Sequence, residues 1–260
     1  MNAEPMFEFY IGIDYSGAET ANSGLRGLRI YTADPNTPPT EVQLSGRRWT
    51  RRAVAEWLQT QLSGDGRTLV GIDHAFSFPI QYFERNDAPR DWTAFLKDFR
   101  HHWPTDNDHT YVDFVRDGIT GNGEARSGNP RWRRLTEIRT RGAKSVFHFD
   151  VPGSVAKSTH AGLPWLLRIR EHTGERVHFW PFDGWDIPPG RSVIAEVYPS
   201  LWNHSLTLHG FDPHQRDAYA IAAWMRTTDA TGSLKQFFSP ELERAEREIA
   251  DVEGWILGVS

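Results

Sequence analysis

Four acidic residues are the part of this sequence best suited to chemistry, because each stands where a folded chain would exclude water. Asp14, Asp73 and Glu196 follow runs of apolar, β-prone residues, and Asp217 lies in the second turn of an expected apolar helix. A carboxylate in such a place loses its hydration unless a cation or hydrogen-bond donors replace the water. Several of these side chains meeting at one point would therefore form a metal site.

The spacing of apolar residues predicts the elements that must position these acids. In chain order the pattern predicts strands at 7–14, 27–33 and 40–44, a helix at 50–62, a strand at 68–73, a short strand at 146–149, a helix at 154–172, strands at 177–181 and 192–198, and helices at 212–226 and 241–253. Thr50 is a suitable N-cap for the first of these helices. The acids of the closing helix are expected to be solvated.

The start of the helix at 212–226 is signalled most clearly. Asp212 suits the N-cap, Pro213 the first helical position, and Gln215 the third position of a capping box. Asp217 then shares a helix face with Ile221, which is apolar. An acid on a buried face needs a partner, so this helix is expected to deliver Asp217 to a site.

The order of elements predicts an α/β fold with a mixed sheet flanked by helices. Acids on the first strand, the fourth strand, a later strand and the last large helix match the layout of the ribonuclease H-like fold. The chain has 260 residues, which suits a single domain over 1–260. Residues 80–145 break the regular pattern with polar, aromatic and Gly-rich stretches, and they are expected to form an insertion after the fourth strand.

Composition limits the chemistry and the setting. The absence of cysteine excludes disulfides, thiolate zinc sites and cysteine nucleophiles, so oxygen or histidine must hold any metal. The sequence lacks a signal-like start and any run of about 18 apolar residues, which predicts a soluble, cytoplasmic protein with no membrane partner. A net charge of -5 argues against a protein that coats nucleic acid through a basic surface.

One segment is nevertheless strongly basic. Residues 126–144 hold seven basic side chains, Arg139 among them, against the single acid Glu137. This segment either grips a nucleic-acid backbone, with Trp132 stacking on an unpaired base, or is a solvated loop.

Four further residues are candidates for contacting substrate phosphate, and they lie where the regular pattern resumes. Lys144 and Ser145 close the basic segment. Ser154 and Thr159 stand near an expected helix start, where backbone amides bind anions.

The chain also resembles a known family at several short motifs. They are Gly12-Ile13-Asp14, Gly71-Ile72-Asp73, Gly142-Ala143-Lys144-Ser145, Gly153-Ser154-Val155, Thr159-His160-Ala161-Gly162, Trp180-Pro181-Phe182, Glu196-Val197-Tyr198-Pro199-Ser200 and Asp217-Ala218-Tyr219-Ala220. In combination they resemble domain of unknown function family 429, a family of predicted nucleases with a ribonuclease H-like fold. The likeness spans residues 8 to 230, and it implies an architecture and an acidic cluster more firmly than a reaction.

This resemblance implies a metal-dependent nuclease that acts on nucleic acid. In a two-metal mechanism, Asp14, Asp73, Glu196 and Asp217 would hold two Mg²⁺ or Mn²⁺ ions about 3.5–4 Å apart. Asp14 would bridge the ions, and the products would be a 3′-hydroxyl and a 5′-phosphate. Ribonuclease H itself carries an acid on its first helix, here Glu56, but helical spacing turns Glu56 toward solvent, so Glu196 is preferred as the fourth acid.

Two other classes of protein remain open at this stage. An actin-like or sugar-kinase-type ATP-binding phosphotransferase would use the segment 12–17 as a phosphate-binding hairpin, but that class needs two copies of the fold. A catalytically silent nucleic-acid-binding or scaffold protein would be favoured if Asp14 and Asp73 were far apart.

Two histidines stand beside the acids in the sequence. His214, three positions before Asp217, is either a proton shuttle or a first-turn surface residue. His74 follows Asp73 directly, so its side chain is expected on the opposite face of the strand, in a structural role.

Overall fold

The computed structural model describes residues 4–203 and 208–260. Its centre is a sheet in the order β3-β2-β1-β4-β6-β5. The strands are β1 Phe9–Asp14, β2 Arg29–Ala33, β3 Thr40–Glu41, β4 Thr68–Asp73, β5 Val177–Trp180 and β6 Ser192–Glu196. The first three strands pair antiparallel, whereas β1, β4, β6 and β5 run parallel. The predicted α/β fold with a mixed sheet flanked by helices is confirmed.

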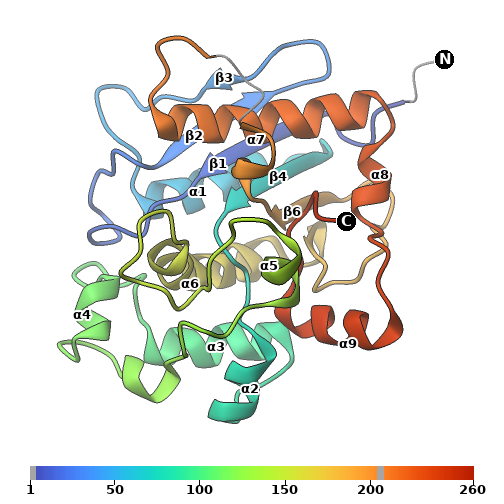
Figure 1. Cartoon of the computed structure of the whole chain (residues 1–260). Coiled ribbons are helices and arrows are strands. Elements are labelled where there is room, and N and C mark those ends of the chain that lie inside the picture. Colours follow the sequence, from blue (N-terminus) through green and yellow to red (C-terminus); the bar gives the residue numbers. More distant parts are fainter. Residues whose placement is uncertain (1–3, 204–207) are drawn as a thin grey trace.

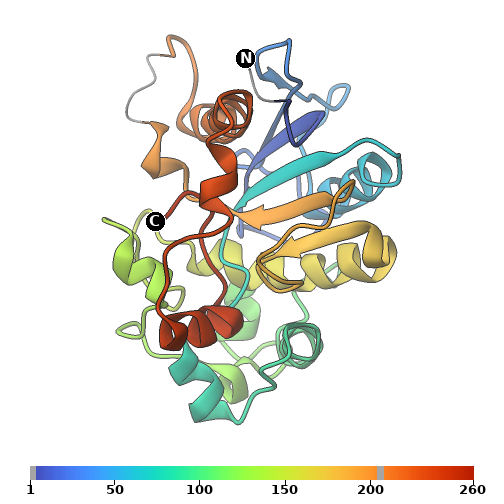
Figure 2. The same ribbon diagram turned by 90° about the vertical axis from the view of Figure 1, so that its right-hand side faces the viewer.

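Helices cover both faces of this sheet (Figure 1). They are α1 Arg51–Gln61, α2 Ile80–Asn86, α3 Trp92–His102, α4 Val112–Arg116, α5 Leu135–Arg139, α6 Ala156–Thr173, α7 Pro213–Ala230, α8 Leu234–Phe237 and α9 Arg244–Glu253, with short 3₁₀ turns at Gly123–Arg126, Gly174–Arg176 and Pro199–Leu201. Figure 2 shows α7 on one side of the sheet and α1 and α6 on the other. Within the described parts of the chain, no helix is both long and apolar enough to cross a bilayer.

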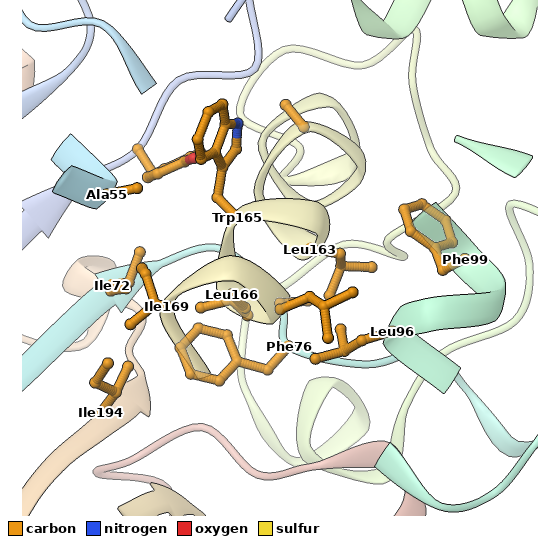
Figure 3. Close-up of a cluster of buried hydrophobic side chains, with 14 of the residues drawn as sticks. Ala55, Ile72, Phe76, Leu96, Phe99, Leu163, Trp165, Leu166, Ile169 and Ile194 are labelled. Atoms are coloured by element: carbon orange, nitrogen blue, oxygen red, sulfur yellow. The ribbon is translucent and has the colours of Figure 1, made fainter. Parts of the chain in front are cut away.

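The alternation of side chains along the strands produces two cores. Ile13 and Ile72 belong to the core shared with α1, α6 and α3. Figure 3 shows Leu166 of α6 lying between Ile72 on the sheet and Leu96 of α3. The alternate strand residues face α7, where Leu69 joins a second core.

Two glycines on this second face bring α7 unusually close to the sheet. Gly12 and Gly71 are paired in register on β1 and β4. A Cβ at Gly12 would lie 2.3 Å from the carbonyl oxygen of Ala218, and one at Gly71 would lie 2.7 Å from Cγ2 of Ile221. The helix backbone therefore rests on the strands themselves, two residues before Asp14 and Asp73.

The two helix caps that the sequence predicts, at Thr50 and Asp212, are confirmed. The Thr50 side chain accepts from the Ala53 amide at the start of α1. Asp212 accepts from the Gln215 amide, and the Gln215 side chain accepts from the Asp212 amide, which completes the capping box of α7.

The predicted strand at 146–149 is wrong. These residues form turns, in which the His148 amide donates to the carbonyl of Ser145. Val146 and Phe147 are buried without pairing with a strand, and the Phe147 ring packs against Phe78 and Tyr82. A four-residue apolar run is too short to show a strand period, so the sequence alone does not distinguish a buried strand from a buried turn.

We predict that Gly12→Ala destabilises the protein, because the new methyl group meets backbone atoms of α7 that cannot move aside alone. Overpacking of this kind costs about 1–3 kcal/mol of the free energy of unfolding. Urea unfolding checks this value. Gly64→Ala is the matched control, since a Cβ there meets nothing within 4 Å. Equal losses in both variants would contradict the close approach of α7.

Candidate functional site

Asp14 and Asp73 stand side by side at the ends of two neighbouring parallel strands. The two residues are paired in register on β1 and β4, and parallel strands lie about 4.8 Å apart. Both follow Gly12 and Gly71 by two positions, so both side chains project on the α7 face. The two acids are therefore neighbours at this edge of the sheet.

The close approach of α7 brings two more polar side chains to the same place. His214, in its first turn, donates from Nδ1 to Oδ2 of Asp14 over 2.7 Å. Gly27 makes room for this ring, because a Cβ there would lie 3.0 Å from its Cε1. Asp217, one turn further along, accepts at Oδ1 from the Asn203 side chain over 2.7 Å.

Burial and mutual repulsion raise the pKa values of the Asp14 and Asp73 carboxyls. Burial raises the pKa of Asp14 to about 6, although the hydrogen bond from His214 opposes the rise; Asp217 adds to it. Burial, and then the charges of Asp14, Asp217 and Glu196, raise the pKa of Asp73 well above its ordinary value. Oδ1 of Asp73 is buried without a hydrogen-bond partner among the described residues. An uncompensated negative charge at this point favours a cation.

Glu196 occupies a different position from the one the sequence predicts. It pairs in register with Ile72, not with Asp73, so its side chain projects on the opposite face, toward α6. There Arg134 donates from Nη1 and Nη2 to its two oxygens, over 2.7 and 2.5 Å. The Phe76 amide also donates to it. Glu196 is therefore already neutralised by a protein cation.

Arg134 is the centre of a buried ion cluster that the sequence did not reveal. Its side chain is 1% exposed and also bonds Glu137 at 2.9 Å and the carbonyl of Glu253 at 3.3 Å. Burial alone would lower the pKa of Arg134, but the charges of Glu196 and Glu137 outweigh that effect and raise it. The only hint in the sequence is the spacing of Arg134 and Glu137, which suits a helical ion pair.

The closing helix contributes to the same cluster, which differs from the expectation that its acids are solvated. Glu253 is 2% exposed. Its carboxylate accepts from the amides of Ile80 and Leu135, over 2.6 and 2.5 Å. It therefore joins the first residues of α2 and α5 to the end of α9.

Lys144 is the one predicted phosphate contact that lies beside the acids. It lines the same small pocket of about 20 Å³ as Asp73, Glu196 and Tyr198. Its ammonium group donates to the carbonyl of Pro152. The space suits a single water molecule, so this pocket leaves no room for a larger group.

The other predicted contacts are used within the fold. Ser145 Oγ accepts from the Phe147 amide, Ser154 Oγ from the Ala156 amide, and Thr159 Oγ1 from the Ala75 amide. Arg139 bonds Glu246 of α9 at 2.5 Å and lies over the Trp255 ring, apart from the acids.

The basic segment at 126–144 is mostly committed to internal contacts as well. Arg126 forms a double hydrogen bond with Asp98, at 2.6 and 2.8 Å, and Arg133 donates to the carbonyls of Glu137 and Ala143. Trp132 packs at 6.3 Å from the Phe147 ring. Of the two interpretations of this segment, neither fits well: it is a folded part of the protein in which few cations are left for nucleic acid.

His74 and Glu56 lie where the sequence predicts. His74 is 1% exposed, on the face opposite Asp73, where its ring contacts Tyr15 at 4.6 Å. Burial lowers its pKa to about 4. Glu56 is exposed on α1.

The acids of this site only partly meet the needs of a metal ion. Among residues 4–203 and 208–260, no three His, Asp or Glu side chains are arranged to hold an ion. A complete two-metal cage is therefore absent from this part of the chain, chiefly because the Glu196 carboxylate is already bonded to Arg134. Asp14 and Asp73 alone still suit Mg²⁺, which is usually bound by one or two carboxylates together with water and substrate phosphate.

We predict that the free energy of unfolding in chelator falls as the pH rises from about 4 through about 6. The folded Asp14 and Asp73 keep their protons to a higher pH than the unfolded chain does, so ionisation opposes folding. Asp73→Asn should match the wild type near pH 4 and exceed it by more than about 1 kcal/mol near pH 8. Urea unfolding across this range, with the exposed Asp65→Asn as control, measures the difference. Parallel pH curves for wild type and Asp73→Asn would contradict it.

We also predict that Arg134→Met lowers the free energy of unfolding by about 3–5 kcal/mol, because two carboxylates remain buried without a counter-ion. Adding Glu196→Gln to that variant should recover part of the loss. Arg139→Met, at the other end of α5, breaks a pair that is 27% and 28% exposed and should cost less than about 1 kcal/mol. Comparable losses in the two single variants, measured by urea unfolding, would exclude this role of Arg134.

Comparison with known proteins adds no relative. No protein-family model matches the chain, and neither the curated proteins nor the solved structures include a significant match. The resemblance to domain of unknown function family 429 therefore stays a prediction.

Proposed function

We propose that the protein is a divalent-cation-dependent hydrolase of nucleic-acid phosphodiesters, built on a ribonuclease H-like fold. One observation carries this proposal: Asp14 and Asp73 are in register on adjacent strands, are partly or wholly buried, and leave an oxygen of Asp73 without a partner. A fold keeps two repelling carboxylates in this arrangement at a cost to stability. Binding a cation together with substrate would explain why the fold keeps this arrangement despite its cost to stability.

Asp14 and Asp73 would hold the ion, with Asp217 adding negative charge nearby. When bound, a divalent ion polarises a phosphoryl oxygen and lowers the pKa of bound water. The proposal needs one ion shared with the substrate phosphate, in place of the two that the sequence suggested. Mg²⁺ and Mn²⁺ both prefer oxygen ligands, which is the donor set that these residues supply.

His214 and Lys144 supply the other charges. The His214 side chain is 48% exposed while its Nδ1 is held by Asp14, so its ring is oriented for proton transfer with solvent or a leaving group. Lys144 lines the same pocket as Asp73, and its positive charge would favour a phosphate that binds outside this pocket, near the acids. Arg134, in contrast, is enclosed and cannot reach a substrate.

The phosphotransferase alternative gains no support from the loop after β1. Gly17 packs so tightly on α6 that a Cβ would lie 2.0 Å from the carbonyl of Lys157. Buried Arg51 donates to the carbonyls of Ser16, Ala18 and Glu19. This loop is held closed by the protein, which leaves little freedom for it to enclose a nucleotide phosphate.

We predict Mn²⁺-dependent cleavage of at least one substrate among single-stranded, duplex, hybrid and branched nucleic acids. Asp14→Asn and Asp73→Asn should each lower the rate by about 100-fold or more, near 3 kcal/mol of transition-state stabilisation. Asp65→Asn is the control, because this exposed acid lies in the turn before β4, at its other end. Mn²⁺ at about 100 times its Kd should stabilise the wild type by about 2.7 kcal/mol and leave Asp73→Asn unchanged.

The outcomes of this experiment separate the classes of function. Cleavage that survives both Asn variants would come from a contaminant. Hydrolysis of ATP without cleavage of nucleic acid would favour the phosphotransferase. Mn²⁺ stabilisation without either activity would favour a silent binding protein, and absence of Mn²⁺ stabilisation would rule out the cation site itself.

A further inference from the structure

Three exposed arginines stand on two neighbouring loops beside the acid site, and we call them the arginine surface. Arg26 lies in the loop between β1 and β2, and Arg47 and Arg48 lie between β3 and α1. All three residues are exposed. Within the ranges 4–203 and 208–260, none of their side chains forms an ion pair or a hydrogen bond. The fold therefore leaves these cations for a partner.

Contacts between the two loops bring these arginines together. The Leu25 amide donates to the carbonyl of Trp49 over 2.9 Å. A Cβ at Gly24 would lie 3.2 Å from the Cβ of Arg48. The segment before β2 thus runs beside the segment before α1, and the arginines of both segments are neighbours on the surface.

A hollow of about 400 Å³ lies between these loops, and Arg47 and Arg48 line it. Glu41 is the one acid among the described residues that line the hollow. Arg29, which also lines it, pairs with Glu41 at 3.2 Å and with Asp212 at 2.8 Å. Because Glu41 already has a cationic partner, Arg47 and Arg48 give the hollow a net positive wall.

The acid site begins at the edge of this surface. Arg29, the first residue of β2, is in register with Asp14 on β1. Gly27 follows Arg26 directly and packs on His214, since a Cβ there would lie 3.0 Å from Cε1 of the ring. The same ring donates to Asp14 over 2.7 Å. A series of direct contacts therefore leads from Asp14 to the segment that carries Arg26.

We propose that the arginine surface binds the phosphate backbone of a nucleic-acid strand that reaches Asp14 and Asp73. Guanidinium groups match phosphate oxygens in geometry and charge, and contacts to phosphate carry no direct sequence information. Trp49, the aromatic residue that lines the hollow, is 5% exposed, so it offers little ring surface for a base to stack on. The surface should therefore bind strands of any sequence. This inference rests on the proposed function, which makes nucleic acid the substrate.

Binding of labelled oligonucleotides to the full chain in chelator tests this surface. Fluorescence anisotropy measures the Kd of single-stranded and duplex DNA and RNA of about 12 nucleotides, over a series of salt concentrations. The test variant combines Arg26→Gln, Arg47→Gln and Arg48→Gln. For the probe that binds most tightly, its Kd at low salt should rise about tenfold or more, and the slope of log K against log salt should become less steep by about 2–3.

A control variant removes the same net charge elsewhere. It combines Arg85→Gln, Arg176→Gln and Lys235→Gln, at exposed residues of α2, of the turn before β5 and of α8. If only net charge mattered, this variant would lose as much affinity as the test variant, whereas we expect its Kd to change by less than about twofold. The proposal is overturned if no probe binds the wild type, if both variants lose the same affinity, or if the salt slope of the test variant is unchanged.

Cleavage in Mn²⁺ separates this inference from the proposed function. For the oligonucleotide, the test variant should raise KM about tenfold and keep kcat within about twofold, because the arginines contact phosphates that do not react. A dinucleoside monophosphate has only the scissile phosphate, so the test variant and the wild type should cleave it equally.

The two failures give different results. Unchanged binding and cleavage of the oligonucleotide by the test variant would overturn the arginine surface and leave the nuclease. Loss of binding that is specific to the test variant, without cleavage by the wild type, would overturn the nuclease and support the surface as a nucleic-acid-binding site.

Discussion

The register of β1 on β4 is the constraint on which the candidate site depends. Because the two parallel strands pair residue by residue, Gly12 faces Gly71, and two positions later Asp14 faces Asp73. The glycines admit the backbone of α7, and the helix in turn brings His214 onto Asp14. A slip of one residue in either strand would send one carboxylate to the opposite face. The pairing of β1 with β4 thus determines the positions of both acids and of α7.

The acids on the two faces of the sheet differ in whether a cation compensates their charge. On the α6 face, Glu196 receives the guanidinium of Arg134 and the Phe76 amide, so its charge is matched. On the α7 face, Asp73 has repelling neighbours and a buried oxygen without a donor among the described residues. Folding alone explains the first arrangement, since a matched buried pair holds β6, α5 and α9 in fixed positions. It does not explain the second, because uncompensated charge opposes folding.

The sequence predicted the parts of this site that depend on local signals. The apolar strands that end at Asp14 and Asp73 are clear in the pattern, and the capping residues Asp212 and Gln215 locate Asp217 within a turn. It could not predict the face of Glu196, because the pairing of β6 with β4 joins Val70 to Ile194, far along the chain. A shift of one position in that register is invisible to composition and decides which core the side chain enters.

Arg134 was missed for a related reason. A run of basic residues is usually a solvated surface, and nothing in the run distinguishes the one arginine that is buried. Its acceptor Glu196 is 62 positions away in the chain. Several cations of the run are paired within the fold, with Asp98, Glu137, Glu196 and Glu246. Charge density along a sequence therefore measures how many cations a segment has, while the partners supplied by the fold determine how many remain for a ligand. By that measure only part of the positive charge of this segment is available to a substrate, at Lys144 and at the exposed Arg131 and Arg141.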